Sequence, residues 1–172
     1  MSSATTYDFW LFDLDGTLVD TEFDYVRETM GRVGEQLGCG FSDREARVLW
    51  HGHRDARERI LDRYDLSLAT FWRTFDAVDD PQARAEATYI HDDAAALLDS
   101  LDGTVPVGVV THCAPFLANE VIDHLDLRSR FDAFVSCSDD LGWKPDPAPV
   151  EHTMAELGVD AESALANQTL EE

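Results

Sequence analysis

Residues 9–20 read FWLFDLDGTLVD, an apolar run that stops at two aspartates two positions apart. A short apolar run with such an abrupt end predicts a buried strand over residues 8–12, of the kind found in parallel sheets. In an extended chain, residues i and i+2 point to the same side, so Asp13 and Asp15 should present both carboxylates at one edge of the sheet. Gly16 then allows the chain to leave by a turn. Two acids at one edge suit a divalent cation, a covalent nucleophile and a proton donor.

The charge balance excludes some classes of partner. The 172 residues are 44% hydrophobic, which is typical of a globular protein, and 13 Lys+Arg stand against 35 Asp+Glu for a formal net charge of −22. Such a surface repels nucleic acid phosphates and anionic membranes, so neither is a predicted partner. The acids are spread along the whole chain, and Lys144 is its only lysine. This pattern is typical of proteins from extreme halophiles, in which concentrated salt screens the self-repulsion.

Cysteine usage and the absence of long apolar runs indicate the compartment. Cys39, Cys113 and Cys137 are odd in number and far apart, which predicts neither a disulfide scaffold nor a zinc site. No apolar run approaches the length of a membrane span, and no basic segment followed by an apolar stretch opens the chain. The sequence therefore predicts a protein of the reducing cytoplasm.

The order of predicted elements indicates an α/β fold. Helical spacing of apolar residues predicts helices over residues 21–37, 42–50, 55–64 and 66–78, with no strand between 21 and 85. Beyond this block the pattern predicts helices at 94–101, 114–125 and 150–157, alternating with strands at 105–110, 131–135 and 163–166. A strand, a helical block and then alternation is the order of a doubly wound, Rossmann-like parallel sheet with a helical insertion after its first strand. The predicted division is an α/β core of residues 1–20 and 86–172 and a helical insertion of residues 21–85.

Functional residues should gather at the carboxyl ends of the strands, where open α/β sheets bind ligands. Asp13 and Asp15 follow the first strand, Thr111 follows the second, and Lys144 lies in the loop after the third. Two acids, a hydroxyl and an ammonium suit phosphoryl transfer, because a carboxylate can attack phosphorus while the cation neutralises developing charge.

Three motifs resemble those of the haloacid dehalogenase-like (HAD) hydrolase superfamily in its phosphatase form. Residues 12–20 (FDLDGTLVD) resemble the first motif, residues 109–112 (VVTH) the second and residues 144–147 (KPDP) the third, and the helical block at 21–85 matches the family's helical cap. The resemblance implies Mg²⁺-dependent hydrolysis of a small phosphorylated metabolite through an aspartyl-phosphate, phosphoglycolate phosphatase-like in broad type. A phosphotransferase or mutase of the β-phosphoglucomutase type shares these motifs and stays open as an alternative.

The resemblance also implies roles for residues at matching positions. Asp13 would be the nucleophile and a Mg²⁺ ligand, and Asp15 would be the general acid and then the general base, with its backbone carbonyl on the metal. Thr111 and Lys144 would hold the phosphoryl group. His112 stands where the family often has Asn, and a hydrogen bond to substrate and a role in capping the loop are equally open.

The segment around His53 and Arg54 separates two predicted helices where caps of this family present a substrate-selecting loop. An arginine beside a histidine would suit an anionic substrate. An ordinary corner between two helices is the alternative interpretation.

The sequence departs from the family pattern after its last predicted strand. The family's fourth motif is an acidic Gly-Asp-type segment that supplies another Mg²⁺ carboxylate, whereas residues 167–172 read NQTLEE, with Thr169 near the position of the acid. The expected sheet is therefore incomplete at its C-terminal side, as in a truncated chain. A catalytically inactive remnant that binds phosphate or another protein is the second alternative.

Overall fold

The computed structural model describes residues 7–159, which divide into two compact units. Residues 7–20 and 89–159 form an α/β unit, and residues 21–88 form a helical unit. No helix within the described residues is long and apolar enough to cross a membrane.

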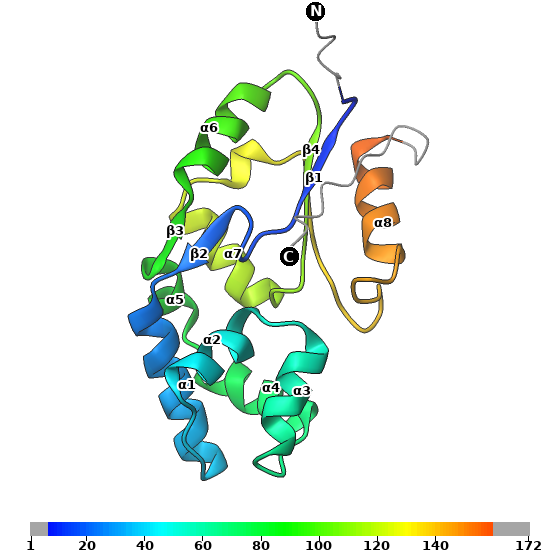
Figure 1. Ribbon diagram of the computed structural model, residues 1–172. Coiled ribbons are helices and arrows are strands. Elements are labelled where there is room, and N and C mark those ends of the chain that lie inside the picture. Colours follow the sequence, from blue (N-terminus) through cyan, green and yellow to red (C-terminus); the bar gives the residue numbers. More distant parts are fainter. Residues whose placement is uncertain (1–6, 160–172) are drawn as a thin grey trace, which may run out of the picture. The chain divides into compact units, whose positions relative to one another are not determined.

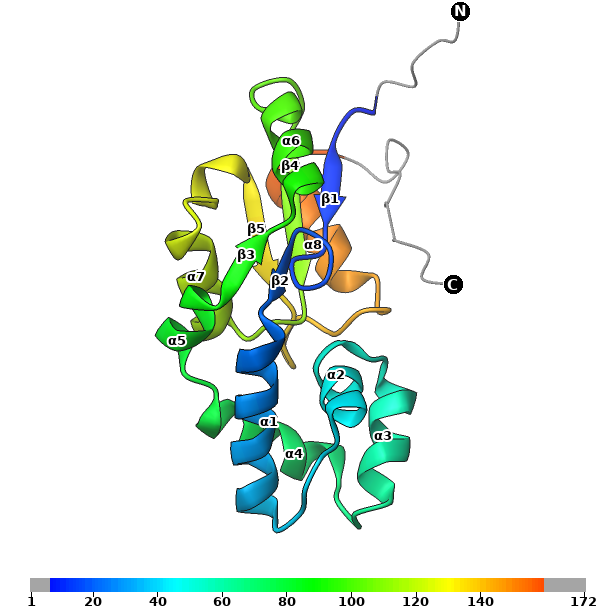
Figure 2. The same cartoon turned by 60° about the vertical axis from the view of Figure 1, so that its left-hand side comes forward.

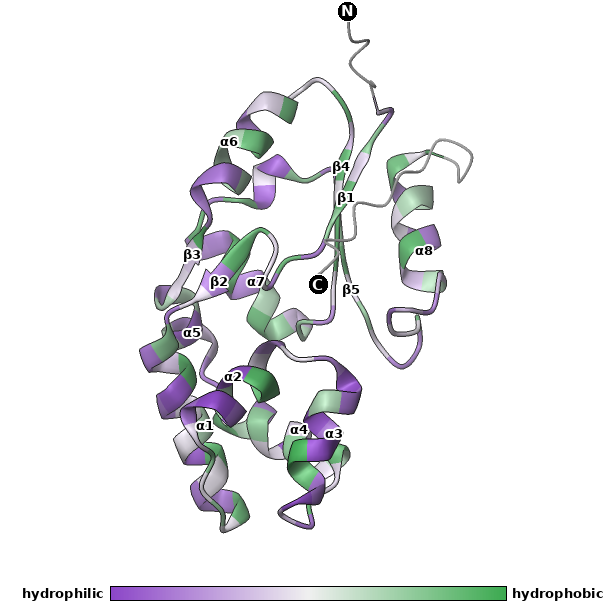
Figure 3. Ribbon diagram, viewed as in Figure 1, coloured by the Kyte–Doolittle hydropathy of each residue, from purple (hydrophilic) through white to green (hydrophobic). Residues whose placement is uncertain are grey.

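The α/β unit is built on a parallel sheet whose described strands run in the order β1-β4-β5 (Figure 1). The strands are β1 (Trp10–Phe12), β4 (Val107–Thr111) and β5 (Ala133–Ser136). Phe12 pairs with Val109, and Val109 pairs with Phe134, so β4 lies in the middle. Every residue of β4 is buried, and its trace is mostly green in Figure 3. The predicted α/β class with a parallel sheet is confirmed.

Helices cover this sheet on both sides. They are α6 (Asp92–Leu101), α7 (Pro115–His124) and α8 (Ala148–Leu157), with a 3₁₀ turn η1 (Arg128–Arg130) before β5. The views in Figures 1 and 2 place α7 and α8 on opposite sides of the sheet. The approach of α8 explains Gly108, because a Cβ there would stand 2.9 Å from Thr153 and 2.8 Å from Leu11. A side chain at position 108 would therefore force the side chains of Leu11 and Thr153 to shift.

A second, two-stranded sheet lies where the chain passes between the units. It pairs β2 (Val19–Thr21) with β3 (Thr88–Ile90), and the buried hydroxyls of Thr21 and Thr88 lie 3.2 Å apart. These strands are not among those predicted from the sequence. Each has three residues, too few for an alternating pattern to stand out.

The helical unit contains α1 (Phe23–Leu37), α2 (Asp43–His51), α3 (Arg54–Asp62), α4 (Leu68–Val78) and α5 (Pro81–Glu86). The first four match the predicted helices within a few residues. The helix α4 ends at Val78, where its prediction ends, and the short helix α5 that follows from Pro81 is not among the predicted helices. Asp80 accepts a hydrogen bond from the Ala83 amide at 2.8 Å, and Pro81 occupies the first helical position, where its missing N–H costs nothing.

Candidate active site

Three separate segments of the α/β unit meet at the carboxyl ends of β1 and β4. Asp13 directly follows β1, and Lys144 comes from the loop between β5 and α8. The Lys144 Nζ lies 2.9 Å from Oδ2 of Asp13 and donates to the Val110 carbonyl at 2.8 Å. This ammonium therefore joins the end of β1 to the end of β4, as the strand order predicts.

The turn after β1 keeps its acids at the surface. The Leu14 carbonyl accepts the amides of Leu18 at 3.0 Å and Val19 at 3.1 Å, and Gly16 has a φ of +76°, in the region that favours glycine. Leu14 and Leu18 are fully buried, whereas Asp13 and Asp15 are only partly buried. The apolar residues between the aspartates thus anchor the turn and leave the carboxylates accessible to a ligand.

Thr111 lies at the end of β4 beside these contacts and is buried, with an exposed fraction of 1%. Its Oγ1 accepts the Cys113 amide at 3.0 Å, and its carbonyl accepts the Cys137 amide at 2.8 Å. The hydroxyl oxygen therefore shapes the loop after β4, while the O–H hydrogen is still able to donate to an acceptor.

Two exposed rings lie next to Thr111 and Lys144 in the sequence. His112 follows Thr111, Trp143 precedes Lys144, and the ring centroids lie 5.7 Å apart with an interplanar angle of 68°. Trp143 is not among the site residues predicted from the sequence. Its position next to the only lysine of the chain is the signal that could have identified it.

His53 and Arg54 belong to the helical unit, whereas Asp13, Thr111 and Lys144 belong to the α/β unit. Both are exposed, and Arg54 pairs with Glu58 one turn along α3 at 2.8 Å. Arg57, which was not predicted, is better anchored, because it donates to the carbonyls of Leu49 at 2.9 Å and Trp50 at 2.7 Å. Burial lowers the pKa of Arg57 to about 10, and its charge faces the carboxyl end of α2.

A metal ion would find only part of a ligand set in the described residues. Within residues 7–159, no group of three or more His, Cys, Asp and Glu could hold one. Mg²⁺ often takes only one or two carboxylates from the protein and completes its shell with water and substrate phosphate. The accessible carboxylate of Asp13, with the backbone carbonyl of Asp15 on the same turn, fits an ion of that kind. Thr169, where the sequence lacks the expected fourth-motif acid, lies outside the described residues.

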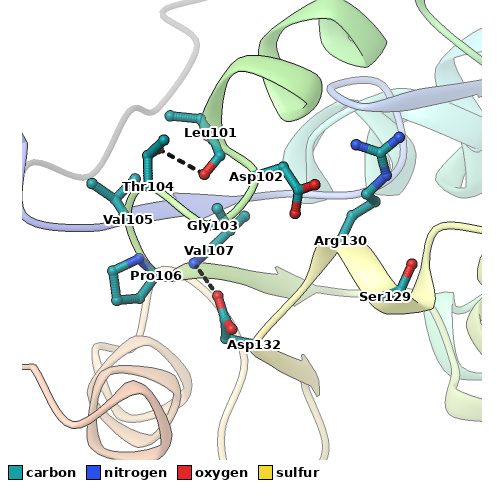
Figure 4. A pocket seen from close by; sticks show the side chains of 10 residues that line it. All are labelled: Leu101, Asp102, Gly103, Thr104, Val105, Pro106, Val107, Ser129, Arg130 and Asp132. Carbon is teal, nitrogen blue, oxygen red and sulfur yellow. Dashed lines mark hydrogen bonds between the residues drawn. The ribbon is translucent and has the colours of Figure 1, made fainter.

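A pocket also opens at the other end of β4, away from the strand ends that carry Asp13 and Thr111 (Figure 4). It is lined by residues 101–107 together with Ser129, Arg130 and Asp132. Two of its charged groups are engaged elsewhere, because Arg130 pairs with Asp99 at 2.6 Å and Asp132 accepts the Val107 amide at 2.8 Å. It supplies no group to the candidate site.

Comparison with known proteins gives one consistent result. Residues 8–166 match the haloacid dehalogenase-like hydrolase family. A phosphoglycolate phosphatase of Neisseria gonorrhoeae is 28% identical over 169 residues, which cover 90% of this chain and 68% of the relative. A phosphoglycolate phosphatase of Aquifex aeolicus is 28% identical over 160 residues, which cover 90% and 72%.

Solved structures share the fold. A HAD-superfamily hydrolase of subfamily IA from Geobacter sulfurreducens superimposes with a TM-score of 0.68 at 20% identity, covering 96% of this chain and 80% of that one. A haloacid dehalogenase-like family protein from Streptococcus pneumoniae gives a TM-score of 0.69 at 18% identity, with coverage of 91% and 72%. At such low identity the likeness concerns the arrangement of the chain.

Proposed function

Because the chain belongs to the haloacid dehalogenase-like hydrolase family, we propose that it hydrolyses a small phosphomonoester and that Asp13 is the nucleophile. The observation that carries the proposal is the contact between Lys144 and Asp13 at the ends of β1 and β4. This arrangement sets an ammonium beside a carboxylate, so that a phosphoryl group can meet a nucleophile and a positive charge together.

In the proposed reaction a carboxylate oxygen of Asp13 bonds to phosphorus while the bond from phosphorus to the leaving oxygen breaks. Asp15 gives its proton to the leaving alcohol. It then takes a proton from the water that cleaves the aspartyl-phosphate and releases inorganic phosphate. The buried residue Leu14 lies between the two acids and holds both carboxylates on one short turn. This arrangement supports the proposal that Asp13 and Asp15 act on the same phosphate ester.

Thr111, His112 and Lys144 are the proposed phosphate-binding residues. Lys144 would supply charge, and Thr111 at the end of β4 would donate its O–H to a phosphate oxygen. The Asp13 carboxylate and the Asp15 carbonyl would hold Mg²⁺, which when bound offsets the repulsion between the phosphate and the acids. These two oxygen ligands fit a Mg²⁺ ion that completes its coordination shell with water and with the phosphate of the substrate.

The helical unit is the proposed cap, and the bounds inferred from the sequence for that cap are residues 21–85. His53 and Arg54 would contact the substrate from the amino end of α3, where the helix dipole also favours an anion.

Release of phosphate from p-nitrophenyl phosphate and from phosphoglycolate, with Mg²⁺ at low and high salt, tests the proposal. Asp13→Asn should abolish turnover, because the amide is a poor nucleophile. Asp8→Asn is the matched control, since Asp8 is exposed and precedes the amino end of β1. Full activity of Asp13→Asn would refute the assignment of the nucleophile. A wild-type protein inactive at every salt concentration would favour a remnant that only binds.

A further inference from the structure

Trp143 is an exposed apolar side chain beside the residues proposed to bind phosphate. Its exposed fraction is 46%, it is one of three large hydrophobic residues that are exposed among the described residues, and it directly precedes Lys144. Its ring packs edge-on against His112, which directly follows Thr111. The two rings therefore contact each other at positions that adjoin Thr111 and Lys144 in the sequence, and His112 is itself one of the proposed phosphate-binding residues.

The indole is held in place, so its exposure does not reflect a loose loop. The Trp143 Nε1 donates to Oδ1 of Asp139 at 2.9 Å. Two backbone hydrogen bonds, of 2.7 and 3.3 Å, close the loop between Ser138 and Gly142, whose φ of +107° suits only glycine. The Trp143 carbonyl also accepts the Asp146 amide at 2.8 Å. A ring fixed in this way can bind a ligand without a further loss of conformational entropy.

The positive charges within the α/β unit indicate which kind of leaving group the two rings would bind. Lys144 is committed to the phosphoryl group, and the two arginines within the described α/β unit pair with acids, Arg128 with Asp123 and Arg130 with Asp99. Among the described residues of this unit, a leaving group that carries a second negative charge finds no further Lys or Arg, so its counter-charge would have to come from His53 and Arg54 of the proposed cap. A leaving group with an apolar ring face finds Trp143 and His112, and ring stacking needs no counter-charge.

We propose that the pair of Trp143 and His112 binds the leaving group by stacking, and that the substrates are phosphomonoesters whose alcohol carries a ring with an apolar face. This inference rests on the proposed phosphatase function. It makes Trp143 a determinant of specificity, because the ring discriminates among leaving groups while Asp13 and Lys144 act on the phosphoryl group that all substrates share.

The kinetic test compares kcat/KM for phenyl phosphate and methyl phosphate. Trp143→Ala should lower the value for phenyl phosphate about tenfold, the size of one good ring contact, and change that for methyl phosphate less than about twofold. Trp143→Phe should retain most of the rate on phenyl phosphate. The matched control is Tyr89→Ala, because Tyr89 is also exposed and its ring packs edge-on against His91 at 5.7 Å, in a strand outside the three-stranded sheet. Equal losses on both substrates in Trp143→Ala would overturn the inference and leave the phosphatase proposal intact.

A binding test separates the inference from the proposed function. Titration with phenyl phosphate should quench tryptophan fluorescence in the wild type, whereas inorganic phosphate should not. Because the chain has four tryptophans, the assignment needs Trp143→Phe, in which the quenching should disappear. Quenching that depends on Trp143 in a protein without turnover would support the stacking site and refute hydrolysis. Quenching that persists in Trp143→Phe would refute the stacking site.

Discussion

Lys144 makes two contacts that an arginine would make poorly. Its Nζ is a compact charge that reaches Oδ2 of Asp13 and the Val110 carbonyl together, whereas a guanidinium is a wide planar fork. In a chain with a single lysine, the retention of this residue is consistent with a task that needs such a point charge. The contact also gives Lys144 a structural part, since it links the ends of two neighbouring strands.

Replacing Lys144 should reduce catalysis much more than stability. We expect Lys144→Ala to lower kcat by about 10²–10³-fold, the effect of removing one group that stabilises transition-state charge. Lys144→Arg should recover only part of the rate, because the charge returns in the wrong geometry. Thermal melts check that both variants fold. The control is Arg128→Ala, which removes a solvent-exposed ion pair and should leave kcat unchanged. If Lys144→Ala kept the wild-type kcat, Lys144 would have no part in catalysis.

Single residues differ in how far the sequence reveals them. Asp13 and Lys144 could be predicted to meet, because the carboxyl ends of parallel strands share an edge and their contact needs only that topology. The ring contact of Trp143 could not, because it depends on the path of a hydrogen-bonded loop. Arg57 was also missed, since the carbonyls it binds belong to another helix and a sequence pattern shows no such partner.

Among the elements, α2 shows a helix start that its sequence predicts. Ser42 and Glu45 form a capping box, in which the Ser42 amide donates to Glu45 at 2.8 Å and Oγ of Ser42 accepts the Glu45 amide. The structure adds two partners for the same carboxylate, Arg63 at 2.7 Å and the Tyr64 hydroxyl at 3.1 Å. One acid therefore ties the start of α2 to the residues that follow α3.

These contacts make the stability of the helical unit depend on pH. The hydrogen bonds from Ser42, followed by those from Tyr64 and the charge of Arg63, lower the pKa of Glu45. Because the folded pKa lies below the unfolded one, the stabilisation is complete above the unfolded pKa of about 4.3 and is lost as the pH falls through the folded pKa. Glu45→Gln should therefore lower Tm at pH 7, and the difference from wild type should narrow below about pH 4. Glu35→Gln, at an exposed position of α1, is the control. A difference that stays constant down to pH 3 would contradict the assignment.

A buried ion pair holds the end of α4 to α5. Asp79 and Arg84 lie 2.8 Å apart with side chains 0% and 6% exposed, and the Tyr25 hydroxyl of α1 donates to Asp79 at 2.7 Å. Burial and this hydrogen bond raise the pKa of Tyr25, so the phenol stays protonated as a donor. The Arg84 guanidinium also lies 4.6 Å from the centre of the Trp50 ring. The pair joins α5, the helix that was not predicted, to the core of the unit.

Removing the acid of this pair should destabilise the unit strongly. Asp79→Ala leaves the Arg84 charge buried without its carboxylate, which costs about 3–5 kcal/mol of unfolding free energy. Asp24→Ala removes an exposed partner of Arg27 at the start of α1 and should change the same quantity by less than about 1 kcal/mol. Urea unfolding of both variants measures the contrast. If both substitutions lowered the unfolding free energy equally, the ion pair of Asp79 and Arg84 would contribute no more than an exposed ion pair.

At the scale of elements, the sequence predicted the long helices better than the short helix α5 and the three-residue strands β2 and β3. Apolar residues at helical spacing placed α1 to α4, because a buried stripe repeats over several turns. Asp80 and Pro81, a capping residue followed by proline, mark the start of α5, but the six residues of this helix are too few for a repeating apolar stripe. Nothing comparable marks β2 and β3, whose pairing brings together residues about seventy positions apart.

At the scale of the whole molecule, we expect the net negative charge to make the stability of the protein depend on salt concentration. A net charge of −22 on 172 residues repels itself in the compact state, and dissolved salt screens this repulsion over about 10 Å at 0.1 M and about 3 Å at 1 M. Tm at pH 7 should therefore rise as KCl increases from 0.1 to 2 M. The control repeats the series near the isoelectric point of 4.3, where little net charge remains to be screened and the rise should be much smaller. Equal slopes at the two pH values would trace the effect to general salting-out, and a flat series at pH 7 would contradict the inference that the acidic surface is adapted to salt.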